Sequence, residues 1–258
     1  MRSAILAIDI GNTNIDLGAY RGEELVAHWR VATDTHKTAD EYAVLVERFF
    51  AQHGLQLSDV EGGIISCVVP PLLSTFDEMC RKYMGIVPLV VGPEIKTGVR
   101  ICTDNPHEVG ADRVVNALAA YRLYGAPAIV IDFGTATTFD IVSKDGDYLG
   151  GAIAPGVAIA AEALFQRTSK LPRIELIAPK GAIGRNTVHS MQSGVIYGYV
   201  GLVEGLVKRI QEELGEKARV IATGGLAGLI AKETSVIEVV DVNLTLEGLR
   251  LIYEMNEG

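Results

Sequence analysis

One short pattern occurs twice in this sequence, and the repeat limits the possible folds more than any other feature. Ile8-Asp9-Ile10-Gly11 recurs as Ile131-Asp132-Phe133-Gly134, so that corresponding positions differ by 123 in residue number. Each copy ends an apolar stretch that is typical of a β-strand, and each is followed by small polar residues and then a second apolar stretch. The repeat predicts two similar strand-turn-strand hairpins, one in each half of the chain.

The flanking segments extend the repeat. In the first half we expect strands at 3–10, 15–20 and 25–32, followed by a helix at 38–53, a strand at 62–67, a helix at 71–83 and a strand at 87–91. In the second half a turn at 144–147 leads into a third strand at 148–153. These patterns predict an α/β fold of two homologous lobes, 1–125 and 126–258, that face each other across a cleft.

Two further helices are predicted from their starting residues and periodicity. Asn105, Pro106 and Glu108 occupy the positions of an N-cap, a first-turn proline and an N3 acid, so a helix should run from there to about Leu123. A long helix is expected at 187–213, although it contains glycines, which are poor helix formers. These glycines include Gly194, Gly198 and Gly201. Close packing of this helix against another helix, across a subunit interface or within the chain, would explain them.

The residue types in the hairpins are suited to binding phosphate. Glycine lets the backbone approach an anion, and the following hydroxyl and N–H groups can donate to phosphate oxygens. Asp9 and Asp132 would each repel phosphate unless a cation lies between the aspartate and the phosphate. Either aspartate alone could simply cap a tight turn, but two copies in register favour nucleotide binding. A third segment, a short strand at 220–222 followed by Gly224 and Gly225, could hold an adenine or ribose.

Composition and charge exclude several classes of function. With 23 basic and 32 acidic residues the net charge is -9, which disfavours binding to nucleic acid or to an anionic membrane. Asp9 interrupts the first apolar run too early for a secretory leader or a membrane span, so we expect a cytoplasmic protein. The sequence has no P-loop pattern, no GxGxxG after the first strand and no protein kinase signature set.

Five ordered segments resemble those of one family. Asp9-Ile10-Gly11-Asn12-Thr13, Gly110-Ala111-Asp112-Arg113, the segment from Asp132 to Thr138, Gly184-Arg185-Asn186-Thr187 and Gly224-Gly225-Leu226 follow the order found in type III pantothenate kinases. These enzymes belong to the superfamily of acetate kinase, sugar kinases, Hsp70 and actin. The resemblance covers the whole chain and implies two duplicated actin-like (ribonuclease H-like) lobes with mixed sheets flanked by helices, and a nucleotide cleft between them.

The resemblance also implies an activity, a set of cofactors and roles for individual residues. The activity is phosphorylation of pantothenate by ATP with Mg²⁺, the first step of coenzyme A synthesis, in a homodimer whose active site forms at the interface. Asp112 matches the general base, and Asp132 matches the ligand of a monovalent cation, K⁺ or NH₄⁺. The implied substrate contacts are Gly110, Ala111, Asp112, Arg113 and Thr187. The implied ATP contacts are Asp9, Ile10, Gly11, Asn12, Thr13, Asn14, Ile15, Asp16, Thr135, Gly224 and Gly225.

Several of these residues also have ordinary structural interpretations. Asp112 would lie near a helix N-terminus, which favours an ionised base at neutral pH, but an acid there is also a common way to balance the helix dipole. Arg113 could grip the substrate carboxylate or form a structural ion pair. Thr187 could contact substrate, cap its helix or do both. Thr103 stands where related sequences often have an aromatic residue, so substrate packing is expected to differ there.

Two alternative functions are compatible with the hairpins alone. One is a sugar or carboxylate kinase of the same superfamily, against which the segments at 110–113 and 184–187 argue. The other is a regulator that binds nucleotide without catalysis, for which we expect a lost base or a lost cation ligand. Asp9, Asp112 and Asp132 are all present, which favours an enzyme.

Overall fold

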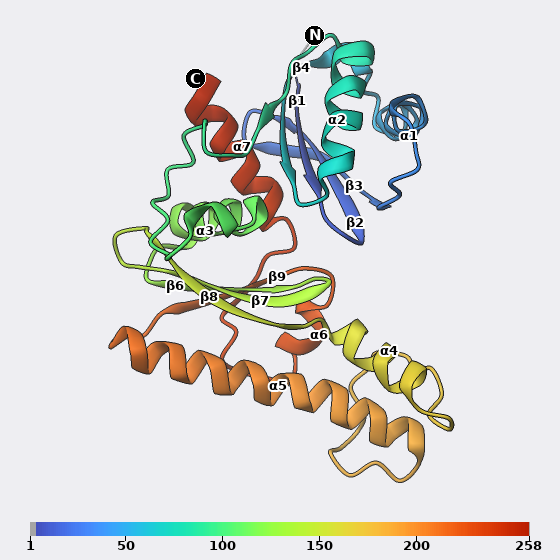
Figure 1. Ribbon diagram of the computed structural model, residues 1–258, viewed down its shortest axis with the longest axis vertical. Coiled ribbons are helices and arrows are strands. Elements are labelled where there is room, and N and C mark those ends of the chain that lie inside the picture. Colours follow the sequence, from blue (N-terminus) through green and yellow to red (C-terminus); the bar gives the residue numbers. More distant parts are fainter. Residues whose placement is uncertain (1–3, 258) are drawn as a thin grey trace. The chain divides into compact units, whose positions relative to one another are not determined.

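A computed structural model describes residues 4–257, and the chain forms two compact units within it (Figure 1). The first unit comprises the described residues up to Val99, then Asp104–Ala119 and the residues from Thr245 onwards. The second unit comprises Arg100–Thr103 and Ala120–Leu244. These units differ from the lobes expected at 1–125 and 126–258, because the last helix of the chain packs in the first unit.

The first unit is built on a five-stranded mixed sheet in the order β3-β2-β1-β4-β5. β1 pairs antiparallel with β2 and parallel with β4, and β5 continues the parallel part. The bounds of the strands are Ala4–Ile10 (β1), Asn14–Arg21 (β2), Glu24–Ala32 (β3), Val60–Cys67 (β4) and Leu89–Val90 (β5). The expected opening meander of three strands is confirmed over the described residues.

Helices cover both faces of this sheet (Figure 1). Alternate residues of β1 point to opposite faces, as the pleat of a strand requires. Leu6, Ile8 and Ile10 pack with α1 (Ala39–Gln52) and α2 (Pro70–Met79). Ala7 packs on the other face, with α3 (Ala111–Tyr124) and α7 (Leu244–Glu257). A capping box at Thr38 and Glu41 fixes the start of α1.

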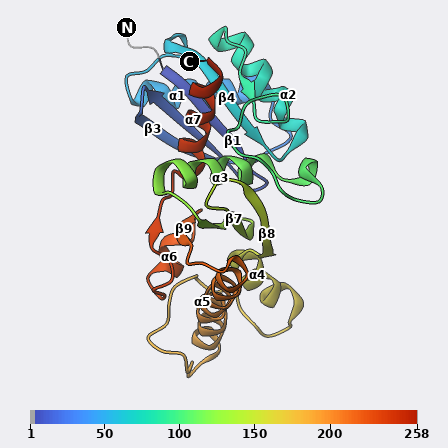
Figure 2. The ribbon, with the colours of Figure 1, turned by 90° about the vertical axis from the view of Figure 1, so that its left-hand side faces the viewer.

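The second unit has a sheet of the same design, in the order β10-β9-β6-β7-β8. Its strands are Ala128–Phe133 (β6), Ala136–Val142 (β7), Tyr148–Pro155 (β8), Arg219–Thr223 (β9) and Val239–Val240 (β10). α4 (Val157–Arg167), α5 (Thr187–Leu214) and α6 (Ala227–Ala231) pack against one face of it. Figure 2 views α5 nearly along its axis, beneath these strands.

The two sheets have one topology, and the predicted duplication is thereby confirmed. In each, the first strand pairs antiparallel with the second and parallel with the fourth, and the fifth lies outside the fourth. β1 therefore corresponds to β6, β2 to β7, and β4 to β9. The chemically important turns follow β1 and β6 at equivalent places.

The helix expected from Asn105 to Leu123 is broken near its start. Pro106–Glu108 form a single 3₁₀ turn, Val109 is extended (φ -75°, ψ 122°), and α3 begins afresh at Ala111. The carbonyl of Gly110 accepts the hydrogen bond of Val114 N at 3.3 Å, which is the first bond of α3. The proline signal was correct for a helical turn but marked only a short one, because the extended backbone of Val109 interrupts the helix before α3 begins.

Smaller differences concern the ends of elements. The helix expected at 71–83 is α2 followed by a π turn at Cys80–Met84, and the strand expected at 87–91 shortens to β5. A 3₁₀ turn at Leu57–Asp59 precedes β4, and neither α4 nor α7 was expected from the sequence. Within residues 4–257 no helix combines the length and hydropathy needed to cross a membrane.

Candidate active site

The first hairpin turns at Gly11, Asn12 and Thr13, between β1 and β2. Gly11 N donates to the carbonyl of Asn14 at 3.0 Å, and this bond closes the turn. The hydroxyl of Thr33 donates to the carbonyl of Gly11 at 2.6 Å and ties the turn to the end of β3. Asn12, Thr13 and Asn14 are exposed, so the turn lies at the surface of the unit.

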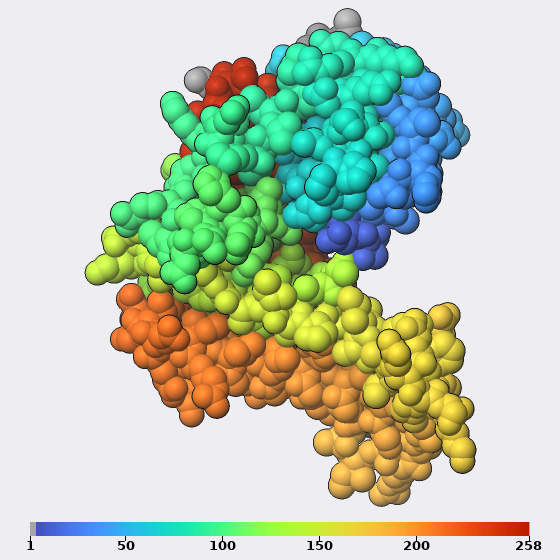
Figure 3. All heavy atoms as spheres, viewed as in Figure 1, coloured from blue at the N-terminus to red at the C-terminus, as the bar shows by residue number. Residues whose placement is uncertain are grey.

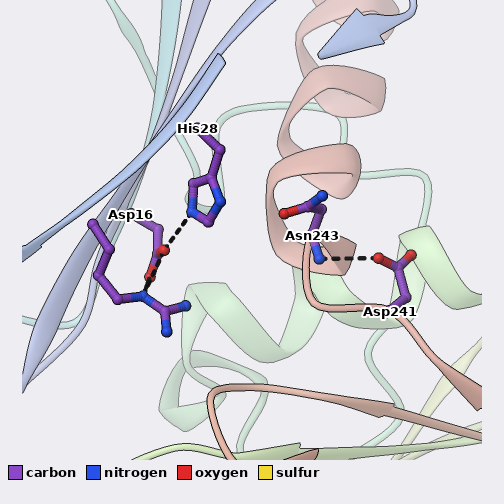
Figure 4. Close-up of polar contacts among 5 residues, drawn as sticks. Asp16, His28, Asp241 and Asn243 are labelled. Atoms are coloured by element: carbon purple, nitrogen blue, oxygen red, sulfur yellow. Dashed lines mark hydrogen bonds and ion pairs between the residues drawn. The ribbon is translucent and has the colours of Figure 1, made fainter. Parts of the chain in front are cut away.

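A row of polar residues crosses the first sheet directly behind this turn. Asp9 pairs with Asp16 on β2, and Asp16 pairs with Arg30 on β3. Two carboxylates in direct register repel each other unless a cation compensates. Asp16 receives that compensation from Arg30 Nε at 2.8 Å and from His28 Nε2 at 2.7 Å, and Figure 4 shows Asp16 and His28 pointing toward one another.

The pKa of Asp16 follows from these contacts. Burial alone would raise it, but the hydrogen bonds and charges of His28 and Arg30 outweigh burial and lower the pKa below its usual range. Asp16 is therefore a firmly ionised carboxylate whose charge is already balanced. Of the acidic pair, Asp9 is left as the better candidate to face a metal cation, while Asp16 holds the strands in register.

The predicted substrate segment lies at the same end of the first sheet. A Cβ on Gly110 would come within 3.8 Å of Val68 Cγ1, and Val68 N donates to the carbonyl of Ile10 at 3.0 Å. The same Cβ would lie 2.5 Å from Asp112 Oδ1, so a side chain at this position would force the Asp112 carboxylate to move. Gly110, Asp112 and the first hairpin are thus brought together by local contacts within one unit.

Asp112 is the second residue of α3, closer to a helix N-terminus than the sequence suggested. Its Oδ1 accepts a hydrogen bond from Arg113 N at 2.9 Å. Desolvation by burial raises the pKa of Asp112, although this hydrogen bond and the charge of Arg113 act to lower it. A carboxylate with a raised pKa is a better proton acceptor than an ordinary one, as a general base requires.

The second hairpin is tighter than the first by one residue. Only Gly134 and Thr135 separate β6 from β7, and Gly134 N donates to the carbonyl of Ala136 at 3.0 Å. In consequence Asp132 pairs with Thr138, whereas Asp9 pairs with another aspartate. Asp132 therefore has no second carboxylate opposite it on β7. Gly134 and Thr135 at the turn are exposed.

Gly224 brings the third glycine segment against the second hairpin. It follows β9 with φ of +87°, in the left-handed region that favours glycine. A Cβ there would lie 2.4 Å from Asp132 Oδ1 and 2.8 Å from the backbone nitrogen of Phe133. Asp132 and Gly224 therefore share one site, and Gly225 and α6 follow directly.

Thr187 and Arg113 were each left with two interpretations by the sequence. Asn186, not Thr187, caps α5: its side chain accepts from His189 N at 2.9 Å. The Thr187 side chain is the first of the helix and is exposed, so capping does not account for it. Arg113 is half-buried beside Asp112, and both its interpretations stay open.

Thr103, in the second unit, has a buried hydroxyl for which residues 4–257 provide no hydrogen-bond partner.

The site residues suit a cation held mainly by a nucleotide. Within the described part of the chain no three His, Cys, Asp or Glu side chains gather as a metal cluster. A cation at Asp9 or Asp132 would therefore take most of its ligands from phosphate oxygens, water and backbone carbonyls, which suits Mg²⁺ and K⁺. The close-fitting glycine turns beside both aspartates suit a phosphate-bearing ligand.

Sequence analysis missed some residues of this region. Gly156 begins the turn before α4, and a Cβ on it would lie 2.2 Å from the carbonyl oxygen of Thr135. Gly156 therefore shapes the second hairpin from a distant element. The sequence signal was a Pro-Gly pair at 155–156 directly before a helix, which marks a turn but does not reveal its neighbour.

Comparison with known proteins places the chain in the family that the sequence motifs resemble. A family model described as type III pantothenate kinase matches residues 5–209. The chain is 57% identical to the type III pantothenate kinase of Moorella thermoacetica, covering 98% of this chain and 99% of that one. It is 58% identical to that of Brevibacillus brevis, covering 98% and 100%.

A solved structure shows the fold at much greater sequence distance. It is the activator of 2-hydroxyisocaproyl-CoA dehydratase from Clostridium difficile, solved with bound ADPNP. It is 12% identical with a TM-score of 0.54, and the match covers 98% of this chain and 95% of that one. The expected fold class is confirmed. Together with the family model and the close relatives, the duplicated hairpins and the Gly110–Asp112 segment identify the chain as a member of the type III pantothenate kinase family.

Proposed function

We propose that this chain phosphorylates pantothenate through the residues described above, with Asp112 as general base and the two hairpins as phosphate-binding turns. ATP-dependent phosphorylation of pantothenate, in coenzyme A biosynthesis, is the activity of its family, and the chain is accordingly a kinase. The observation that carries the residue assignment is the adjacency, in the first unit, of Gly110 and Asp112 to the end of β1 and its turn.

The assigned residues have distinct roles in this reaction. Backbone N–H groups and side chains at Asn12, Thr13 and Thr135 donate to phosphate oxygens, and Gly224 and Gly225 leave room for the nucleoside. Asp112 accepts the proton of the pantothenate hydroxyl as its oxygen attacks the γ-phosphorus of ATP. The Arg113 guanidinium binds the carboxylate of the substrate, and Thr187 makes a further substrate contact.

Two cations are assigned to the two aspartates. Mg²⁺, which kinases use with ATP, neutralises charge on the phosphates when bound, and Asp9 is the side chain that would hold it, directly or through water. Asp132 is proposed to hold K⁺ or NH₄⁺ beside the second turn. The lack of a side chain at Gly224 supports this, because a Cβ there would lie 2.4 Å from Asp132 Oδ1 and would crowd an ion bound at that oxygen.

We also propose that the protein is a cytoplasmic homodimer with its active sites at the interface. Apolar side chains are exposed in the second unit, including Ile153, 67% exposed, and Ile183, 88% exposed. Others lie on α4 and the following segment, which project at one end of that unit (Figure 3): Ile159, Leu164, Phe165 and Ile177. Such a concentration of exposed apolar surface is typical of an interaction site.

A coupled assay of ADP release tests the proposed substrate and the proposed role of Asp132. ADP should form with pantothenate as acceptor, and neither glucose nor acetate should support comparable turnover. In the same assay, replacing K⁺ by Na⁺ should lower the rate, and Asp132→Asn should remove the difference between the two ions. Equal turnover with glucose would contradict the substrate assignment, and equal rates in both ions for the unaltered protein would contradict the role of Asp132.

A further inference from the structure

Ser66 lies beside Asp9 in the first sheet, and its hydroxyl is buried without a visible partner. β1 and β4 run parallel, and Asp9 and Ser66 are direct neighbours across them. Ser66 is 0% exposed, and none of residues 4–257 forms a hydrogen bond with its Oγ. Burying an unsatisfied hydroxyl costs about 1–3 kcal/mol, so a serine at this position calls for an explanation.

The position of Ser66 in the polar row suggests that explanation. Directly paired residues project from the same face of a sheet, so Arg30, Asp16, Asp9 and Ser66 form one line across four strands. Arg30 and His28 hold Asp16 on one side of Asp9. Ser66 flanks Asp9 on the other side. Because its Oγ has no partner among residues 4–257, a hydrogen bond to the Asp9 carboxylate requires rotation of one of the two side chains or one bridging water.

The second unit repeats this arrangement. Asp132, which corresponds to Asp9, pairs in parallel register with Thr223 at the end of β9, and Thr223 is 2% exposed. A buried hydroxyl residue thus lies beside the acidic residue in both units. The neighbouring sequences differ, since Ile65 and Cys67 flank Ser66 whereas Ala222 and Gly224 flank Thr223. Local packing alone does not explain why both positions retain a hydroxyl.

We propose that Ser66 is a positioning residue for Asp9. Its hydroxyl donates to the Asp9 carboxylate when Mg²⁺ and ATP are bound, and so orients the remaining lone pairs of that carboxylate toward the cation. Ser66 forms and breaks no covalent bond in this role. The inference rests on the proposed function of Asp9 and predicts that Ser66 acts only through it. Residues that orient a metal ligand typically change metal affinity about 10–100-fold when they are lost.

The test measures ATP binding by calorimetry at increasing Mg²⁺ concentration, without pantothenate, so that turnover is not involved. Ser66→Ala should raise the Mg²⁺ concentration at half-maximal binding by about tenfold. Its melting temperature without ligand should stay the same or increase, because an unpaired buried hydroxyl has been removed. Ser66→Thr, which copies the residue of the second unit, should remain within about twofold of the unaltered protein. Ser74→Ala, an exposed serine on α2, serves as control.

A double variant shows whether Ser66→Ala changes the Mg²⁺ requirement through Asp9 or independently of it. In the Asp9→Asn background, Ser66→Ala should cause no further change in the Mg²⁺ requirement. An unchanged requirement in Ser66→Ala alone, or an equal effect in both backgrounds, would overturn the inference and leave the proposed function intact. If the unaltered protein bound ATP equally well without Mg²⁺, the proposed role of Asp9 would fail, and this inference with it.

Discussion

Asp112 carries two opposing influences on its carboxylate. Burial raises its pKa, while the adjacent backbone N–H and the charge of Arg113 lower it, and burial prevails. A base with a raised pKa becomes protonated at a higher pH than an ordinary carboxyl group. As the pH is lowered, the rate of the enzyme should therefore begin to fall at a higher pH than it would with a base of ordinary aspartate pKa.

Replacing Asp112 by Asn tests this role. Turnover should drop by about 10²–10⁴-fold while ATP affinity stays nearly the same, and the residual rate should lose the acidic limb of its pH profile. Stability at neutral pH should increase, because the folded state no longer holds a charge that burial disfavours. Steady-state kinetics across pH and thermal unfolding measure both effects. Full activity in this variant would remove Asp112 from the mechanism.

Gly224 is the second residue whose environment permits a firm expectation. Gly224→Ala places a Cβ 2.4 Å from Asp132 Oδ1 and forces alanine into a left-handed backbone conformation. We expect a loss of about 2 kcal/mol in unfolding free energy, together with weaker ATP binding. Gly228→Ala is the control, since a Cβ at Gly228 in α6 meets no atom within 4 Å. Equal stability of the two variants would contradict the tight Asp132–Gly224 contact.

Among the elements, α5 combines high glycine content with an open surface. Gly194, Gly198, Gly201 and Gly205 recur at helical spacing, and among residues 4–257 a Cβ at any of them would meet no atom within 4 Å outside the nearby backbone of α5 itself. Packing within the chain therefore does not account for them. If close helix packing is the reason for these glycines, the partner is a second molecule, as in the proposed homodimer.

Gly198→Ala distinguishes these possibilities. In the isolated chain it should stabilise α5 by about 1 kcal/mol, because alanine is the better helix former and has room. If α5 packs closely on a partner, the same change should weaken dimerisation about tenfold or more. Sedimentation equilibrium and thermal unfolding give the two quantities, with Arg209→Ala on the same helix as control. Unaltered dimerisation would exclude the glycine face from the interface.

How far the sequence predicts these elements depends on whether the signal is local. The hairpins after Asp9 and Asp132 were expected at the correct residues, because strand, glycine and polar turn occur together in one short segment. The break at Val109 was not expected, because the Pro106 signal marks a helix start without fixing its length. Ser66 and Gly156 escaped notice for another reason: their neighbours Asp9 and Thr135 are remote in sequence.

For the whole molecule, the packing of α7 is the main feature that the sequence did not predict. The helix lies against the first sheet although its residues follow those of the second. Tyr20 Oη donates to Glu247 Oε1 at 3.2 Å, and Asn256 Nδ2 donates to the carbonyl of Lys96 at 2.9 Å. Leu249 is completely buried among residues of β1, β4 and α3.

Leu249→Ala should therefore destabilise the first unit from the far end of the chain. We expect a loss of about 2–5 kcal/mol, because a large buried side chain leaves a cavity. Hydrogen exchange should accelerate most in β1 and β4, with smaller changes in β6 and β9. Val242→Ala, a change at an exposed position just before α7, is the control. Faster exchange confined to the second sheet would contradict this assignment of α7.

The return of α7 also reverses the usual order of folding during synthesis. Domains generally fold from the N-terminus as the chain leaves the ribosome. Here every element of the second unit has been translated before α7, while the first sheet, made earliest, still lacks the cover over Ala7, Tyr20 and Ile64. The half of the protein that is translated first is therefore the last to be completed, and its nascent apolar face needs protection until the final helix emerges.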